Sequence, residues 1–210
     1  MRKLSTLMFA AMLVLAVAAS SEVSADKGWF AGFSAGQASW GSYTDEFDPD
    51  IEDIEMLDDS DLGYLVFGGY QITKRFGVVG GFADFGEISA SGTADYTSDG
   101  WTDLLDASGP FAAGQVYFPL SDRFVSFVTV GVLYWDMGYV WTEDGTVYSG
   151  SDNGTSFMYG AGANFWLNST QNSGIHIEWD RFDAVGNLDV LEHEVDIDLF
   201  SVGWVYRFGK

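Results

Sequence analysis

The sequence contains no cysteine, which excludes a disulfide-stapled scaffold of the kind found in many small secreted proteins. Only three of the 210 residues are proline, whereas the chain has 26 glycines, 17 phenylalanines, 10 tyrosines and 8 tryptophans. This composition is poor for helices and favours strands joined by tight turns. Basic residues are also scarce, since nine Lys and Arg stand against 31 Asp and Glu and the formal net charge is -22. A nucleic-acid partner, which needs a basic surface, is therefore excluded.

Long apolar runs are absent except at the N-terminus. Two basic residues precede an apolar stretch over residues 7–19, and small residues follow it at positions 23–25, where a signal peptidase would cut. This stretch is shorter than the ~20 residues of a membrane-spanning helix. We therefore predict a signal peptide over residues 1–25 and one mature domain over residues 26–210, with a cut after Ser20 as the alternative.

The mature chain alternates glycine-rich and aromatic-rich segments with polar connections, which is typical of an antiparallel meander. We predict an all-β fold, an eight-stranded antiparallel up-and-down transmembrane β-barrel. The predicted strands are 28–41, 62–73, 76–87, 104–118, 124–141, 155–167, 174–184 and 197–208. The predicted short connections are 72–76, 119–123 and 168–174, and the long ones are 42–61, 88–103, 142–154 and 185–196. Bacterial outer-membrane barrels have this layout, with short periplasmic turns and longer outside loops.

Alternation within the strands indicates which face meets lipid. One face carries large rings and branched chains, and the other mixes glycine with polar residues and occasional Phe or Leu. The second set cannot cover a protein exterior but can fill the narrow interior of an eight-stranded barrel. The residues predicted to face lipid are Tyr70, Trp179, Trp204, Tyr206 and Phe208. The polar residues predicted to face the interior are Gln71, Gln115, Asn164, Glu178 and Arg207.

Charge is distributed unevenly between the two ends of the predicted barrel. The basic residues expected at the short-turn rim are Lys27, Lys74, Arg75, Arg123 and Lys210. The connection 42–61 contains ten carboxylates and no base, which is most simply a solvated surface. It lacks the spacing of an EF-hand, so we predict no defined metal site, only weak binding of divalent cations there.

Three segments carry a likeness to a known family. They are "LFSVGWVYRFG" at residues 199–209, "FGGYQI" at 67–72 followed by "FGVVGGFADFG" at 76–86, and "IHIEWDRFDAVGN" at 175–187. These segments resemble the transmembrane domain of OmpA-like outer-membrane proteins, and the likeness spans the whole mature chain. The resemblance implies a location in the outer membrane of Gram-negative bacteria, amid lipid and lipopolysaccharide. The last strand also resembles the C-terminal aromatic signal that the outer-membrane assembly machinery recognises.

Two departures from the family pattern limit what can be transferred. The family places an inward glutamate in the third strand and an inward lysine in the fourth, whereas Val79 and Gln115 stand at the matching positions here. Glu178 matches the seventh-strand glutamate, so we expect no interior salt-bridge gate of the family type. Only two residues follow Phe208, so we expect no peptidoglycan-binding domain in this chain.

The two histidines are the candidates for an enzymatic function. His176 and Glu178 share the inward face of one strand, and His193 lies in the last long connection, but the His-Ser-acid set of a lipid A-modifying barrel does not appear. We predict no catalytic residue and no cofactor. A buried carboxylate needs partners, so we predict that Glu178 joins a polar plug with Gln115, Asn164, Gln71 or Arg207.

The predicted function is a non-enzymatic structural role in the envelope, with acidic loops exposed at the surface. A narrow pore is one alternative, although eight-stranded barrels are normally filled by side chains. An adhesin or ligand-binding protein acting through the long loops is another, since rigid scaffolds often carry function on loops. A lipid A-modifying enzyme is the alternative from a different class.

Overall fold

A computed structural model describes residues 27–41, 52–94, 100–143, 145–168, 170–186 and 195–208. The predicted signal peptide, the 42–51 part of the acidic connection, His193 and Lys210 lie outside these residues. The strands are β1 (Gly28–Gly41), β2 (Glu52–Asp58), β3 (Ser60–Gln71), β4 (Phe76–Ala94), β5 (Gly100–Pro119), β6 (Phe124–Glu143), β7 (Thr146–Trp166), β8 (Ser173–Val185) and β9 (Val195–Arg207). The described residues form no helix that is long and apolar enough to cross a membrane.

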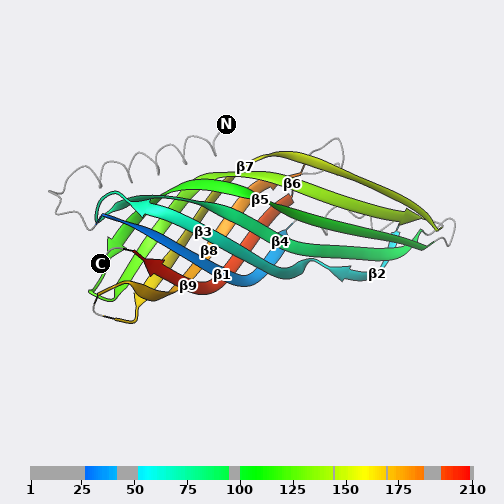
Figure 1. Cartoon of the computed structure of the whole chain (residues 1–210). Coiled ribbons are helices and arrows are strands. Elements are labelled where there is room, and N and C mark those ends of the chain that lie inside the picture. Colours follow the sequence, from blue (N-terminus) through cyan, green and yellow to red (C-terminus); the bar gives the residue numbers. More distant parts are fainter. Residues whose placement is uncertain are drawn as a thin grey trace, which may run out of the picture.

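Eight of these strands close into an antiparallel barrel, which confirms the predicted fold class (Figure 1). The first and last strands of the chain, β1 and β9, pair with each other, and β4 pairs with β5 to complete the ring. Closure leaves no strand edge within the wall, as a hydrocarbon environment requires. The short strand β2 stands outside the ring and pairs with the far part of β4.

The connections at one end of the barrel are short, and we call this the turn end. Thr73 Oγ1 accepts hydrogen bonds from the backbone N–H groups of Arg75 and Phe76, at 3.1 and 3.0 Å. Ser121 Oγ does the same for Arg123 and Phe124, at 3.3 and 3.1 Å. Hydroxyl side chains thus close both hairpins, which explains why the turns are tight and polar.

The opposite end, which we call the extended end, differs from the sequence prediction. Residues 88–103 and 142–154 were predicted to be long loops, but β4 and β5 stay paired out to Thr93 and Gly100, and β6 and β7 out to Glu143 and Thr146. Between β6 and β7, Gly145 at φ +74° permits a tight hairpin turn in place of the predicted loop. The prediction of loops was therefore wrong for these two connections, and a sheet projects beyond the barrel (Figure 1).

A bulge in β4 lies where the pairing partner of β4 changes from β3 to β2. The register of β4 shifts between Asp84 and Glu87, and Gly86 sits there at φ +73°. Asp61 accepts the backbone N–H of Glu87 at 2.9 Å and that of Leu62 at 2.7 Å. These two hydrogen bonds, the one from Glu87 first, lower the pKa of the Asp61 carboxyl and fix the bulge.

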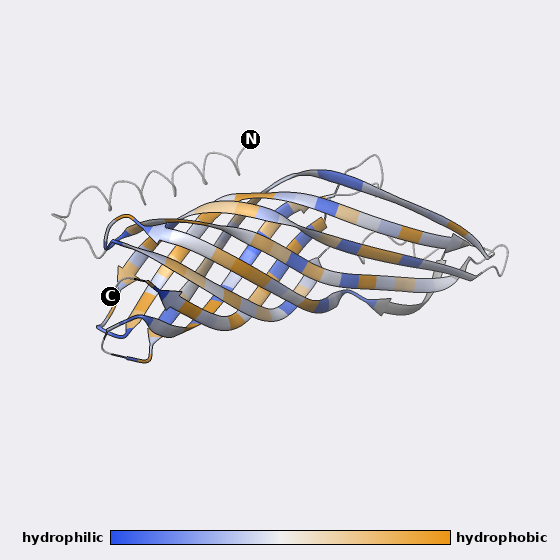
Figure 2. Ribbon diagram, in the orientation of Figure 1, coloured by the Kyte–Doolittle hydropathy of each residue, from blue (hydrophilic) through white to orange (hydrophobic). Residues whose placement is uncertain are grey.

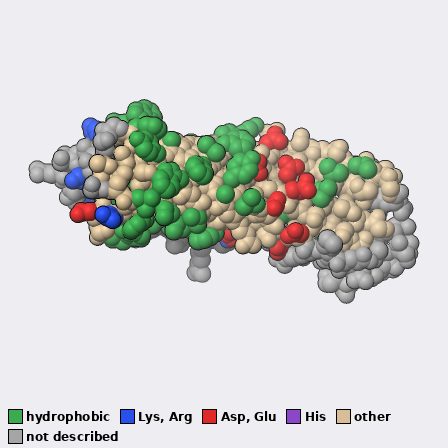
Figure 3. Space-filling model, turned by 60° about the horizontal axis from the view of Figure 1, so that its bottom comes forward, with side chains coloured by type: hydrophobic (Ala, Val, Ile, Leu, Met, Phe, Trp, Pro, Cys, Tyr) green, Lys and Arg blue, Asp and Glu red, His purple; other side chains and the backbone are tan. Residues whose placement is uncertain are grey.

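Hydrophobic and hydrophilic residues alternate along the strands (Figure 2), as expected when successive side chains point to opposite faces of the wall. In β9 the side chains of Val202, Trp204 and Tyr206 are exposed on the outer wall, whereas Ser201 and Val205 are buried. On the face shown in Figure 3, hydrophobic side chains gather in a band, with carboxylates beyond it and basic residues at the turn end. This order of bands is what an outer-membrane barrel needs.

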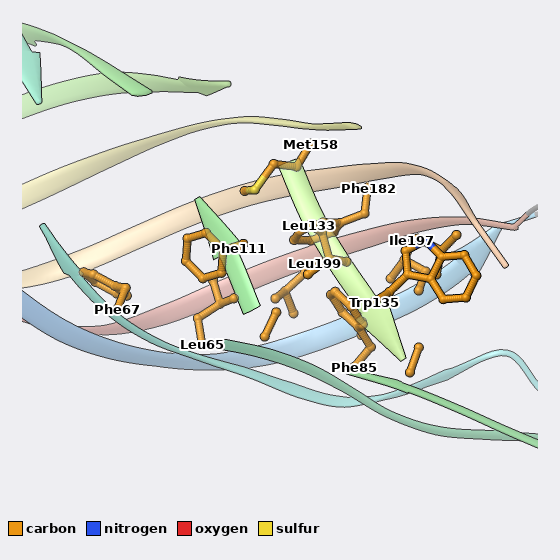
Figure 4. Packing of buried hydrophobic residues seen from close by; sticks show 14 of the residues in the cluster. Leu65, Phe67, Phe85, Phe111, Leu133, Trp135, Met158, Phe182, Ile197 and Leu199 are labelled. Carbon is orange, nitrogen blue, oxygen red and sulfur yellow. The ribbon is translucent and has the colours of Figure 1, made fainter. Parts of the chain in front are cut away.

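The interior is more apolar than the sequence analysis predicted. In the half of the lumen toward the extended end, large side chains interdigitate with little or no exposure, and we call them the apolar plug (Figure 4). Its members are Leu65, Phe85, Phe111, Leu133, Trp135, Met158, Phe182, Ile197 and Leu199. The prediction of a mainly glycine and polar interior is therefore wrong for this half, because the alternating glycines leave room for neighbouring rings.

Candidate functional site

The inward polar side chains of β5, β6, β7 and β8 form one connected group, which we call the lumen network. Its members are Gln115, Tyr117, Thr129, Asn164, His176 and Glu178. Tyr117 donates its hydroxyl hydrogen to Gln115 Oε1 at 2.6 Å, and Gln115 Nε2 donates to Thr129 Oγ1 at 3.3 Å. Thr129 in turn donates to Glu178 Oε1 at 2.8 Å.

His176 completes the network from the neighbouring position on β8. Its Nε2 lies 3.0 Å from Glu178 Oε2, and its Nδ1 lies 2.8 Å from Asn164 Oδ1. Both facing atoms are oxygens, so each ring nitrogen has a hydrogen-bond partner. The imidazole thereby lies within ion-pair distance of the buried Glu178 carboxylate.

Aromatic rings hold the imidazole in place. The ring of Phe127 stacks on that of His176 with a centroid distance of 5.4 Å and an interplanar angle of 17°. Phe67 approaches the imidazole from β3 at 4.8 Å. His176 and Glu178 are only 2% and 6% exposed, so their interaction is hardly screened by water.

A second polar pair lies nearer the turn end. Arg207 Nη2 donates to Gln71 Oε1 at 2.6 Å, and Gln71 Nε2 donates to the carbonyl oxygen of Lys74 at 3.4 Å. The guanidinium carbon of Arg207 lies 4.6 Å from the centroid of the Trp166 ring, within the range of a cation–π contact. Gln71 is thereby joined to the β3–β4 turn, and Arg207 caps the lumen at that rim.

Asp180 is a further inward carboxylate, one inward position beyond Glu178 on β8. It is buried, and its Oδ1 has no hydrogen-bond partner among the described residues. A Cβ atom at Gly160 would lie 2.1 Å from that oxygen, so only glycine leaves room for it. Asp180 thus stands at the boundary between the lumen network and the apolar plug.

Among the described residues, two small cavities inside the barrel each have a volume of about 10 Å³. One lies beside His176 and Arg207, and the other beside Glu178 and Asp180. Such a volume holds about one water molecule. Neither cavity is large enough to admit a solute.

All five polar residues predicted for the interior are buried inside the barrel, but their partners differ from the prediction. They are Gln71, Gln115, Asn164, Glu178 and Arg207. Glu178 contacts Thr129 and His176 directly, whereas Gln115 and Asn164 are each one hydrogen bond further away. Gln71 and Arg207 bind each other at 2.6 Å. Of the predicted partners, Gln115 and Asn164 therefore reach Glu178 through Thr129 and His176.

The five aromatics predicted to face lipid lie on the outer wall. Trp179, Trp204, Tyr206 and Phe208 are exposed, and Tyr70 is half-buried against Trp29, with ring centroids 5.0 Å apart. Val79, which stands where the family resemblance would place a glutamate, lies in the wall of the cavity beside Glu178.

Sequence reasoning missed four inward polar residues of this region. The alternation in β8 places His176 and Asp180 on the inward face, but neither was predicted among the interior polar residues, and Thr129 was not singled out. Tyr117 was expected among the strand-end aromatics at the level of the lipid headgroups, which is wrong, because it is buried in the lumen. Thr129 is the polar member of an inward series that includes Val125 and Phe127. That break in an apolar series was the signal that could have identified it.

Catalysis and metal binding depend on where His176 and the carboxylates of the described residues lie. His176 is enclosed in the lumen between Asn164 and Glu178, away from the lipid surface. No group of three or more His, Cys, Asp or Glu side chains in the described ranges could hold a metal ion. The one ion-pair cluster on the outer wall surrounds Arg181, which contacts Asp183, Asp196 and Asp198 at 3.3, 2.5 and 2.8 Å among the described residues.

Comparison with known proteins gives a consistent family assignment. The family model of the OmpA-like transmembrane domain matches residues 24–210. Outer membrane protein A of Yersinia pseudotuberculosis is 27% identical over 188 residues, covering 88% of this chain and 50% of that protein. Outer membrane protein A of Salmonella typhi is 24% identical over 192 residues, covering 88% of this chain and 49% of that protein. The chain thus spans about half the length of these curated relatives.

A solved structure supports the same architecture. Neisserial surface protein A aligns with a TM-score of 0.52 at 12% identity, covering 86% of this chain and 97% of that one. At this level of identity the likeness shows the fold alone.

Proposed function

The chain belongs to the OmpA-like transmembrane domain family and is an outer-membrane β-barrel, and from this premise we propose that it is a non-enzymatic structural protein whose lumen does not conduct solutes. The observation that carries the proposal is the apolar plug, which fills the lumen toward the extended end with large, buried side chains. An eight-stranded barrel has an interior just wide enough for side chains to fill it. The lumen network adds a second, hydrogen-bonded closure toward the turn end.

Solute uptake by proteoliposomes tests the closed lumen. Vesicles containing the purified barrel should swell in isotonic sugar solutions no faster than protein-free vesicles. A large general porin, reconstituted at the same ratio of protein to lipid, serves as the positive control. Swelling that increases with the amount of barrel would contradict the proposal and support the narrow-pore alternative.

The structural role is tested in cells. A strain that lacks the protein should become more sensitive to detergents and bile salts, and the wild-type gene should restore resistance. Complementation by a His176→Asn variant, which removes the imidazole that an enzyme would need, separates a structural role from a catalytic one. If the folded variant failed to restore resistance, the non-enzymatic proposal would be wrong.

The expected partners are lipid, lipopolysaccharide and the outer-membrane assembly machinery. The outward side chains of β9 support the last of these, because Trp204, Tyr206 and Phe208 recur at every second position up to the end of the strand. Replacing Phe208 by serine should slow assembly in cells without changing the stability of the refolded barrel. Equal assembly rates of the variant and the wild-type protein would contradict recognition of this strand by the assembly machinery.

A further inference from the structure

Within the residues that the structure describes, the part of β7 toward the extended end, Thr146–Thr155, is an open strand edge. β7 pairs with β8 only from Phe157 onward, where Phe157 faces Asp183. Over Thr146–Thr155, pairing is with β6 alone in the part of the chain that the structure describes. These ten residues extend over about 33 Å. They contain no proline, lysine or arginine, the residues that commonly protect such an edge.

The alternating direction of the backbone N–H groups along β7 shows which residues point their hydrogen-bonding groups away from β6. The N–H of Trp166 donates across to Arg123 on the β6 side, and the N–H of Leu167 donates to Ser173 on the β8 side. The register between β6 and β7 has no shift, so this alternation continues along the strand. Val147, Ser149 and Ser151 therefore direct their N–H and C=O groups away from β6, toward the open side.

Aromatic rings line the inner side of the same edge. The rings of Tyr139 and Trp135 lie over Gly150 and Gly154, where a Cβ atom would approach them to 2.3 and 2.4 Å. Tyr148 of β7 stacks on Trp141 of β6, with centroids 5.1 Å apart and an interplanar angle of 27°. Both stacked rings are exposed among the described residues, so they offer apolar surface beside the edge.

A carboxylate completes this surface. Asp152 lies opposite Met137 on the inner face of the edge. Its Oδ1 accepts the backbone N–H of Asn153 at 2.8 Å, but its Oδ2 is buried without a hydrogen-bond partner in the described structure. A buried carboxylate oxygen is costly until a donor or a cation reaches it. The charge of the site therefore favours a basic partner.

We propose that this edge binds an extended, basic segment of another polypeptide, which adds as an antiparallel strand to β7 over Thr146–Thr155. The backbone of the segment would bond with Ser149 and Ser151, one of its Arg or Lys side chains would meet Asp152, and its inward side chains would cover the Trp141–Tyr148 ring pair. Strand addition of this kind takes affinity from the main chain and specificity from alternate side chains. The net charge of the protein supports a basic segment.

A second copy of the chain fits the edge less well. Copies in one membrane share their orientation, so their β7 strands run in the same direction and cannot pair antiparallel. Copies in facing membranes could do so, but both extended ends carry carboxylates in excess, which opposes their approach. The basic segment is therefore the occupant that the observations favour.

Binding is measured with the whole barrel in phosphatidylcholine nanodiscs and fluorescent peptides of about ten residues, the length of the edge. The first peptide alternates valine and arginine, the second alternates valine and glutamate, and the third is the arginine peptide with its edge-facing nitrogens methylated. Only the first should bind. Because the third keeps the charge and loses the N–H donors, equal binding of the first and third peptides would reduce the interaction to non-specific electrostatics and overturn the proposal.

Paired variants locate the site. Ser149→Pro and Ser151→Pro each remove an open N–H without removing a bond to β6, and together they should weaken binding about tenfold, whereas Ser149→Ala and Ser151→Ala should not. Asp152→Asn keeps the acceptor for Asn153 and should weaken binding about threefold, while Asp122→Asn at the turn end should not. Unchanged binding in the proline variants, or clustering of barrel-bearing vesicles without any peptide, would contradict the assignment.

Discussion

The two halves of the lumen close the same barrel wall by different physical means. Toward the turn end, the pair His176 and Glu178 is held by hydrogen bonds to neighbouring polar side chains. Toward the extended end, residues such as Leu133 and Trp135 exclude water by packing alone. The two halves should therefore be destabilised by different substitutions. Toward the turn end the costly defect is an unpaired buried charge, and toward the extended end it is an unfilled void.

The largest effect should follow from breaking the charge pair. His176→Leu leaves the Glu178 carboxylate buried without its imidazole partner, and the free energy of unfolding should fall by about 4 kcal/mol. The measurement is urea unfolding of the barrel in phospholipid vesicles, followed by tryptophan fluorescence.

The double variant His176→Leu/Glu178→Leu provides the control. Since it removes both members of the pair and leaves no unpartnered carboxylate at position 178, it should be markedly more stable than the single variant. If the single and double variants were equally destabilised, lost packing would explain the effect, and the charge pair would not distinguish this half of the lumen.

A void in the apolar plug should cost somewhat less. Leu133 has no exposed surface, and Leu133→Ala should lower the free energy of unfolding by about 3 kcal/mol through lost burial and a residual cavity. The neighbouring Val132 faces outward and is 49% exposed, so Val132→Ala should cost less than about 1 kcal/mol in the same vesicles. Similar losses at both positions would mean that the plug is not tightly packed.

The bulge at Gly86 tests the wall beside the extended half. Gly86→Ala places a Cβ atom 2.4 Å from Asp61 Oδ2 and forces a non-glycine residue to adopt φ +73°, so unfolding free energy should fall by about 2 kcal/mol. The pKa of Asp61 should also rise toward its ordinary value, because the hydrogen bond from Glu87 is disturbed. Gly100→Ala is the matched control, since a Cβ atom there would meet nothing within 4 Å. An NMR titration of Asp61 that is identical in the parent and in Gly86→Ala would count against this account.

The smallest effect is expected on the outer wall. Partial burial, and then the carboxylates of Asp84 and Asp136, raise the pKa of Asp106. A raised pKa means that the folded state holds this proton more tightly, so stability should decrease as the pH rises above the ordinary Asp range. Asp106→Asn should therefore add ~0.5 kcal/mol at neutral pH and flatten that decrease. Urea unfolding of the parent and of Asp106→Asn at several pH values measures this difference. A variant less stable than the parent at neutral pH would contradict the raised pKa of Asp106.

The barrel itself could be predicted from the sequence because a period of two is a local signal. Alternation in β8 and β9 is enough to place Glu178 inside and Trp204 outside. The projecting part of β7 could not be predicted in the same way, because Ser149–Thr155 has the small, polar composition of a loop and becomes a strand only by pairing with β6.

Contacts across the lumen could not be predicted from the sequence, for a different reason. Thr129 and Glu178 are 49 positions apart, and their contact depends on the register of three neighbouring strands. Periodicity assigns a residue to a face but does not give its height in the barrel. The partners of Glu178 were therefore mispredicted, although its burial was anticipated.

The most direct test of the closed lumen is the ionic current through single barrels in a planar lipid bilayer. A lumen filled by the apolar plug at one end and the lumen network at the other should give no stable conductance steps, and the double variant Leu133→Ala/Trp135→Ala should pass current more often than the parent. Regular steps in the unmodified protein, unaffected by changes in the plug, would contradict the account.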